Sequence, residues 1–255
     1  LVSVLTALAF QGFFLLPLRG EQFVIGPWKR NGLATERFTI TGTGGRNNPL
    51  RRAITPPFAG DELFIRFHLR YDADSIDAPP DASGEFFVLW LDREEGSDGS
   101  THSNNVPNLG IHVKDDQNRF MIRYNSSEQR FGPPLEGDRD YLVLGRLWKS
   151  RPGPQQRFDQ LDLWVDPDPD EENSPDISIQ NDRSITEVGW IGFSTGAKTE
   201  IDDKIDVWDI RVADSWRVVL DLPSELTADD LDLDHSRLNQ EKTVSGIPPP
   251  RATDF

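Results

Sequence analysis

Hydrophobic and polar residues alternate in short stretches through the middle of the chain. In Leu63 to Tyr71, apolar residues at every second position alternate with a mixed set that includes Arg66, His68 and Arg70. One face of such a segment is buried and the other is partly wet, which predicts a half-exposed antiparallel strand. The stretch from Phe86 to Leu91 is apolar on both faces and predicts a central strand that is covered from two sides.

Further segments of strand character follow at short intervals, separated by clusters of Gly, Pro, Asn and Asp. They are Phe38 to Thr41, Arg119 to Tyr124, Tyr141 to Trp148, Gln160 to Val165, Val188 to Phe193, Lys204 to Val212 and Trp216 to Leu222. No long amphipathic helix precedes residue 223, and no internal repeat of fixed period is evident. The pattern therefore predicts an all-β domain built as a two-sheet antiparallel sandwich.

The two ends of the chain differ from this middle part. Leu1 to Leu18 is an uncharged apolar run that is typical of an export signal, with an uncleaved signal anchor as the alternative. We expect residues 1–20 to be that segment, 21–222 to be the β-domain, and the acidic, proline-rich residues 223–255 to be a linker or tail. The protein is then exported to the periplasm, the cell surface or the medium, and meets a membrane only through an uncleaved N-terminal segment.

The chain is acidic and contains no cysteine. Its 43 Asp and Glu outnumber 27 Lys and Arg, which gives a net charge of -16. This balance repels nucleic-acid phosphate and no basic stripe offsets it, so nucleic acid is excluded as a partner. Without cysteine there is no disulfide framework, and stability must come from burial and bound cations.

Catalysis would need residues that the chain offers only in part. Asp92 and Glu94 lie two residues apart after a predicted strand, as a pair of glycosidase carboxylates could, but the turn at Gly96 predicts a solvated corner. The four histidines have no accompanying catalytic or zinc motif, and we interpret them as structural or solvent-facing.

Two acidic loops offer the oxygen ligands that Ca²⁺ prefers. The first runs from Asp92 to Asn105 and the second from Asp166 to Asp176, and neither has the spacing of an EF-hand. We single out Asp92, Asp98 and Asp170 as metal ligands, with an ordinary solvated loop as the alternative for each.

Trp164 stands between Asp162 and Asp166, on the expected outward face of its strand. An exposed indole beside carboxylates would suit stacking on a sugar, and packing beneath the following proline-rich loop is an equal alternative. The predicted ligand contacts are Trp164, Asp166, Asp168, Asn104 and Asn105.

The last strands resemble a known family. The stretch KIDVWDIRVADSWRVVL is similar to the closing strand and turn of concanavalin A-like, laminin-G-like jelly rolls in large exported bacterial proteins, matched from Asp206 to Val219 with Trp208 at a position that is often acidic. YLVLGRL, LDLWVDPDP and VGWIGFSTG also resemble strands of that family, over roughly Arg37 to Leu222. The resemblance implies a jelly-roll fold and a module that binds carbohydrate, often with Ca²⁺, or serves in adhesion.

The related family-sixteen glycoside hydrolases carry a Glu-x-Asp-x-x-Glu motif that this chain lacks, since Ser97 occupies its third acidic position. We therefore predict a noncatalytic module that binds a glycan or an extracellular protein. A structural or interaction domain is the alternative, and a hydrolase is less favoured. The acidic and proline-rich end resembles the approach to a planctomycete-type cytochrome c module, which implies further C-terminal domains.

Overall fold

The computed structural model describes residues 37–76, 85–96, 105–113, 117–125 and 127–223. Over these residues the strands form two antiparallel sheets, six strands in each. Sheet A contains, in spatial order, β1 (Arg37–Thr41), β12 (Lys204–Ala213), β3 (Glu62–Tyr71), β8 (Asp140–Trp148), β9 (Gln160–Val165) and β10 (Ile177–Gln180). Sheet B contains β2 (Asn47–Phe58), β11 (Val188–Thr195), β4 (Glu85–Asp92), β5 (Asn108–Val113), β6 (Arg119–Asn125) and β7 (Glu128–Pro134).

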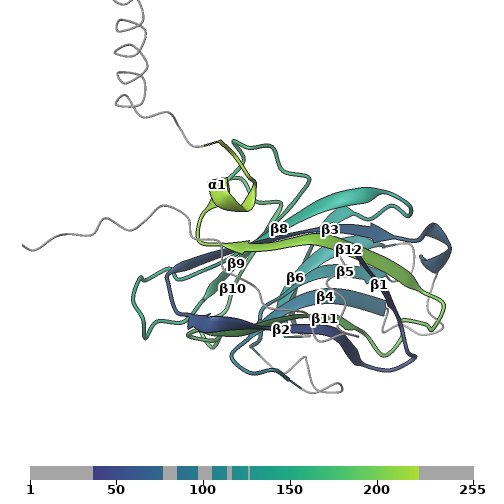
Figure 1. Cartoon of the computed structure of the whole chain (residues 1–255), viewed down its shortest axis with the longest axis horizontal. Coiled ribbons are helices and arrows are strands. Elements are labelled where there is room, and N and C mark those ends of the chain that lie inside the picture. The colour runs from purple at the N-terminus through teal and green to yellow at the C-terminus, as the bar shows by residue number, and fades with distance from the viewer. Residues whose placement is uncertain (1–36, 77–84, 97–104, 114–116, 126, 224–255) are drawn as a thin grey trace, which may run out of the picture. The chain divides into compact units, whose positions relative to one another are not determined.

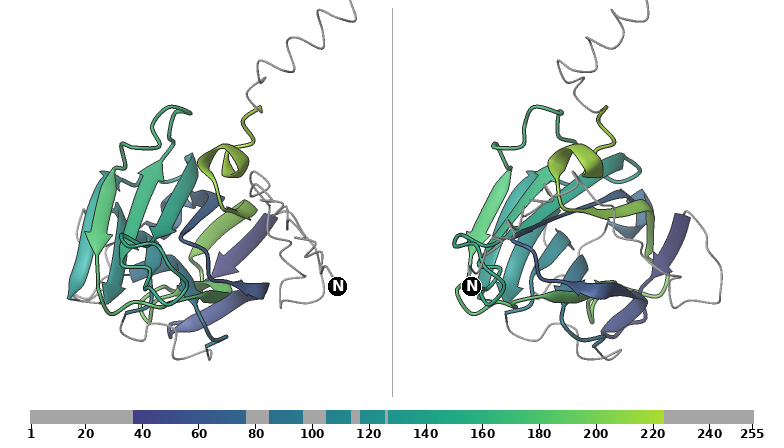
Figure 2. Two further views of the ribbon diagram at one scale, coloured as in Figure 1. Left: turned by 90° about the vertical axis from the view of Figure 1, so that its left-hand side faces the viewer. Right: turned by 60° about the vertical axis from the view of Figure 1, so that its left-hand side comes forward.

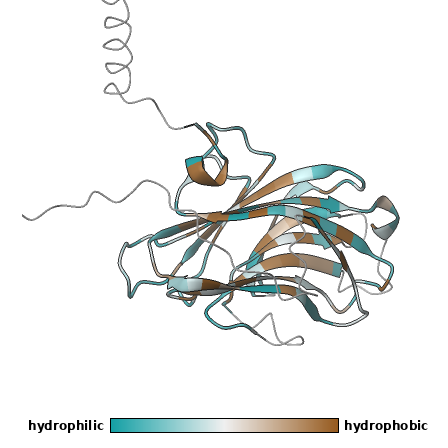
Figure 3. Ribbon diagram, viewed as in Figure 1, coloured by the Kyte–Doolittle hydropathy of each residue, from teal (hydrophilic) through white to brown (hydrophobic). Residues whose placement is uncertain are grey.

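The two sheets pack face to face, as Figure 1 shows, and form the predicted jelly-roll sandwich. Their inner faces contribute the apolar half of each alternating strand, and the brown stretches of β4, β5 and β6 in Figure 3 lie on the side toward sheet A. Phe193 of β11 joins the layers, because its ring lies 5.2 Å from Phe67 of sheet A and 5.5 Å from Phe87. The core is therefore built from side chains that the period-two pattern had already assigned to it.

Glycine allows the sheets to approach closely at one point. A side chain at Gly145 in β8 would place its Cβ 2.6 Å from Cδ2 of Leu109 in β5. Such a contact requires the leucine to move, so the small residue sets the local separation of the layers.

Two short helices accompany the strands. The 3₁₀ helix η1 (Ala73–Ser75) follows β3, and α1 (Trp216–Val219) follows β12. The α1 helix packs on β12 and β3, on the outer side of sheet A, as the two views in Figure 2 show. The predicted strand from Trp216 to Leu222 is thus wrong, because Trp216 and Val219 are both buried at the i, i+3 spacing of one helical face.

Four strands were absent from the prediction: β2, β5, β7 and β10. Three of them are sheet edges, where proline and glycine are tolerated because one side of the strand makes no ladder. Pro49, Pro56 and Pro57 in β2, and Gly132 with two prolines in β7, hide the alternation. No helix within the described ranges is long and apolar enough to span a membrane. The predicted segments 1–20 and 224–255 lie outside the described residues.

Candidate functional site

Trp164 occupies the second of its two predicted positions. Its side chain is 1% exposed, and its indole Nε1 donates a 2.8 Å hydrogen bond to the carbonyl oxygen of Glu171 in the following loop. The ring also lies 5.1 Å from the ring of Trp216 in α1. The indole therefore packs beneath the loop, and no face of it is open for stacking on a sugar.

Asp166 and Asp168 organise the same loop. Asp166 has a left-handed backbone with φ of 53°, its Oδ1 accepts a 2.7 Å hydrogen bond from the Leu142 amide, and its Oδ2 accepts one from Arg139 at 2.9 Å. The amide of Asp168 donates to Glu171 Oε2 at 2.8 Å. Both residues are exposed, so a role in ligand contact stays a prediction beside these structural ones.

The two predicted asparagines and the metal ligands do not converge in the part of the chain that the structure describes. Asn105, with φ of 74°, accepts a 3.3 Å hydrogen bond from Asn181, whereas Asn104 and Asp98 lie outside the described residues. Asp92 ends β4, and Asp170 is exposed in the loop after β9. Burial raises the pKa of Asp92 above its usual value, more than the amides of Arg93 and Glu94 lower it. Within the described ranges no three acidic or histidine side chains are placed to hold a metal ion.

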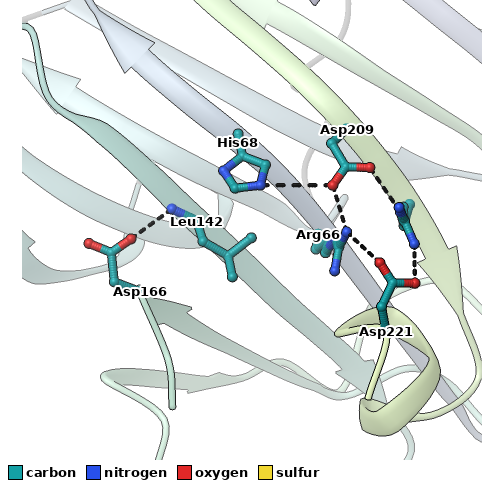
Figure 4. Close-up of polar contacts among 7 residues, drawn as sticks. Arg66, His68, Leu142, Asp166, Asp209 and Asp221 are labelled. Atoms are coloured by element: carbon teal, nitrogen blue, oxygen red, sulfur yellow. Dashed lines mark hydrogen bonds and ion pairs between the residues drawn. The ribbon is translucent and has the colours of Figure 1, made fainter. Parts of the chain in front are cut away.

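A charged cluster that the sequence did not predict lies on the outer face of sheet A (Figure 4). Nη2 of Arg66 in β3 contacts Asp209 Oδ2 at 2.5 Å and Asp221 Oδ2 at 3.0 Å. Arg211 contacts the same two carboxylates, with its Nε 2.8 Å from Asp209 Oδ1. His68 Nε2 lies 3.8 Å from Asp209 Oδ2. We call these five residues the arginine–aspartate cluster.

A β-bulge creates this cluster. Trp208 pairs with His68 and Arg211 with Arg66, so β12 places two residues where β3 places one. The extra residue turns Asp209 toward the arginines, with φ of 47°, and Asp221 after α1 also has a positive φ, of 56°. Aspartate tolerates this backbone better than most residues do.

The cluster has the spacing but not the electrostatics of a hydrolase site. The carboxylate oxygens that share Arg66 Nη2 lie no further apart than the about 5.5 Å typical of retaining glycosidases. Burial raises the pKa of Asp209, but the hydrogen bonds and charges of Arg211 and Arg66 outweigh it and hold that pKa below its usual 3.8. A proton donor needs a raised pKa, so we interpret the cluster as structural.

The cluster predicts a pH dependence. A carboxylate whose folded-state pKa is depressed binds fewer protons than in the unfolded chain, so its stabilising effect is complete well above 3.8 and is lost as pH falls through its folded pKa. Asp209→Asn, which tolerates the same backbone, is expected to be less stable than wild type at neutral pH, with the difference shrinking below about pH 4. Urea unfolding of both proteins from pH 7 to pH 3 measures this, and a difference that does not change with pH would contradict it.

The outer face of sheet B carries a different set of side chains. One row of paired residues crosses it, formed by Trp90 of β4, Asn108 of β5, Arg123 of β6 and Gln129 of β7. The indole of Trp90 donates a 3.1 Å hydrogen bond to Asn48 Oδ1, and Ser194 also donates to this oxygen. This end of the row is a buried network with its indole hydrogen-bonded.

The other end of the row is more open. Phe131 of β7 pairs with Met121 and is 44% exposed, and its ring lies 5.6 Å from that of His112 in β5. Arg119 pairs with His112 and donates to the carbonyl oxygen of Gly132 at 3.1 Å. We call Phe131, His112, Arg119 and Arg123 the β5–β7 face. The alternation in Arg119 to Tyr124 placed both arginines opposite the core, but β7 was not predicted, so its aromatic residue was missed.

Comparisons with known proteins give similarity at low identity. No protein-family model matches the chain, and no curated protein matches it. Among solved structures, the metal-free carbohydrate recognition domain of Emp46p is similar with a TM-score of 0.45 and 12% identity, over 76% of this chain and 87% of that one. The globular domain of T. cruzi calreticulin has a TM-score of 0.42 and 11% identity, over 87% and 100% of the two chains.

A sialidase is also similar, with a TM-score of 0.44 and 12% identity over 69% of this chain. The chain spans 15% of the sialidase's length. No residue role is carried over from these structures.

Proposed function

We propose that this chain is a noncatalytic glycan-binding module and that the β5–β7 face is its binding surface. The single observation that carries the proposal is the exposed ring of Phe131 beside polar side chains on a rigid sheet. Phe131 and Ile201 are the exposed large hydrophobic residues of the described part of the chain, and Phe131 lies on a strand.

The chemistry of this face suits a sugar ring. A pyranose presents one apolar face of C–H groups and a rim of hydroxyls, so it needs a flat aromatic surface and nearby hydrogen-bonding groups. Phe131 offers the ring, and Arg119, Arg123 and Gln129 lie on the same side of the strands. Side chains on strands are held more firmly than those on loops, which reduces the ordering cost of binding.

Absence of catalysis belongs to the same proposal. The close carboxylates of the chain, Asp209 and Asp221, are bridged by two arginines and lie on the other sheet. The predicted export of the chain and a Ca²⁺ ion in the Asp92 to Asn105 loop stay predictions that the glycan proposal does not require.

Binding to a panel of immobilised neutral and acidic polysaccharides tests the proposal. Phe131→Ala is expected to weaken the interaction about tenfold or more, because it removes the stacking ring. Its unfolding midpoint should stay close to that of wild type, since the ring is half exposed. Affinity is measured with the full chain by biolayer interferometry.

Ile201→Ala is the matched control, since Ile201 is 78% exposed and lies outside the β5–β7 face. It should bind as wild type does. If no polysaccharide binds, or if both variants bind equally well, the surface is not a glycan site and the structural or interaction reading gains.

A further inference from the structure

Arg123 is a buried cation without a counter-charge. Its side chain projects from β6 on the side away from the core, and the residue is 8% exposed. Among the described residues no carboxylate lies within 4.0 Å of its guanidinium and no hydrogen bond engages it. Buried arginines are normally paired with an acid or fully hydrogen-bonded, so this position departs from what folding alone favours.

The guanidinium reaches diagonally across the sheet. Arg123 pairs with Asn108, whereas Phe86 of β4 pairs with His112, four residues further along β5. The Arg123 Cζ nevertheless lies 4.5 Å from the centroid of the Phe86 ring. The side chain thus crosses β5 near Gly110, which has no side chain to block it, and rests on an aromatic surface of the central strand.

A second arginine approaches the same point. Burial, and then the like charge of Arg46, lower the pKa of Arg123 to about 10. Arg46 is exposed and directly precedes β2, and within the described part of the chain it also has no acidic partner within 4.0 Å. Both groups remain cationic at neutral pH, so two positive charges face each other over Phe86 and an anion between them would relieve their repulsion.

We propose that the glycan bound by this face is an acidic polysaccharide whose carboxylate or sulfate groups pair with Arg123, with Arg46 as a second cation. This inference rests on the proposed glycan-binding function and names its ligand class. A planar guanidinium donates two parallel hydrogen bonds to a carboxylate or sulfate, which a neutral sugar cannot accept with the same strength. Phe131 lies diagonally from Arg123 across β6 and β7, at about 7–8 Å between backbones, so one sugar residue can contact both.

The net charge of the chain makes this binding selective. At -16 the protein as a whole repels an acidic polymer, so nonspecific attraction does not explain binding. The β5, β6 and β7 strands differ from the rest, because they contain Arg119, Arg123 and Arg130 against one carboxylate, Glu128. Glu128 already accepts hydrogen bonds from Asn125 and Asn181 at 2.9 and 2.6 Å.

The experiment compares four polymers on the full chain: polygalacturonate, dextran sulfate, neutral dextran and poly-L-glutamate. Wild type is expected to bind polygalacturonate or dextran sulfate at least about tenfold more tightly than dextran or poly-L-glutamate. Either acidic polysaccharide supports the inference, and the preference between them identifies carboxylate or sulfate as the group recognised.

Variants of Arg123 then test the residue itself. Arg123→Met should reduce acidic-polysaccharide binding about tenfold or more while leaving the melting temperature equal to or above that of wild type, because it removes a desolvated, unpaired charge. Arg123→Lys keeps the charge without the planar fork and should lose part of the affinity. Arg130→Gln is the charge-matched control, since Arg130 pairs with Ile122 and so lies on the opposite side of the same strand pair.

The outcomes separate the two proposals. If dextran binds as tightly as polygalacturonate, the acidic class is wrong while glycan binding stands. If poly-L-glutamate binds as tightly as the acidic polysaccharides, the face recognises an acidic polypeptide and the inference is overturned. A folded Arg123→Met protein with unchanged binding overturns it as well, and binding to none of the polysaccharides removes the glycan proposal on which it rests.

Discussion

Phe193→Ala is expected to lower the free energy of unfolding of the domain by about 3–5 kcal/mol. The ring is fully buried, packs edge-on against Phe67 of the opposite sheet and stacks on Phe87 of its own. Truncation removes the contacts of a whole ring and leaves a cavity where the two layers meet, and close-packed interiors collapse only partly around such a void.

Urea unfolding followed by circular dichroism measures this change. The midpoint should fall while the dependence on urea concentration stays the same. Phe193→Leu should cost less, because leucine refills part of the space. Phe131→Ala, which removes the same ring from a half-exposed position, should change stability by no more than about 0.5 kcal/mol. Equal midpoints for Phe193→Ala and Phe131→Ala would show that Phe193 does not join the sheets.

Trp216→Ala is expected to cost about 3–5 kcal/mol of stability as well, through the outer face of sheet A instead of the core. Trp216 is 2% exposed, its ring lies 5.1 Å from that of Trp164 and 6.2 Å from that of Phe64, and its Nε1 donates to the Pro169 carbonyl oxygen at 2.8 Å. The residue therefore holds α1 and the loop after β9 against one side of the sheet.

Three further variants test this interpretation. Trp216→Phe keeps an aromatic ring and loses the hydrogen bond, so it should cost about 1 kcal/mol for that bond. The double variant Trp164→Ala with Trp216→Ala should cost less than the two single variants together, since each removes the partner of the other. Trp208→Ala is the control on the same sheet, because Trp208 is half-buried and stacks on His68. A Trp216→Ala protein as stable as wild type would contradict the packing of α1 on sheet A.

The alternating segments were predicted well because their information is local. Leu63 to Tyr71 and Gln160 to Val165 correspond to β3 and β9 within a residue at each end. A strand needs side chains of one kind at every second position, and this requirement is visible without knowledge of the partner strands. The same logic placed Arg119 and Arg123 on the side of β6 that faces away from the core.

The candidate site was predicted poorly because its residues meet only through pairing between distant strands. Asp209 reaches Arg66 because β12 bulges opposite β3, and no feature of KIDVWDIRV shows this bulge. Trp164 was open to two interpretations, and the choice was made by Trp216 and Glu171, which come from a helix and a loop. Strand β7, with the exposed Phe131, lacks alternation because it is an edge strand with glycine and proline.

By itself the sequence determined that this protein is a two-sheet β-sandwich, because burial of one face of each strand imposes a period of two on the chain. It also determined the acidic surface and the absence of disulfides. Only the tertiary structure decided which polar side chains stand together: that Asp209 and Asp221 are neutralised by arginines, and that Arg123 is left beside Arg46 with no acid. These depend on strand register and bulges, where a shift of one residue reverses the face on which every side chain lies.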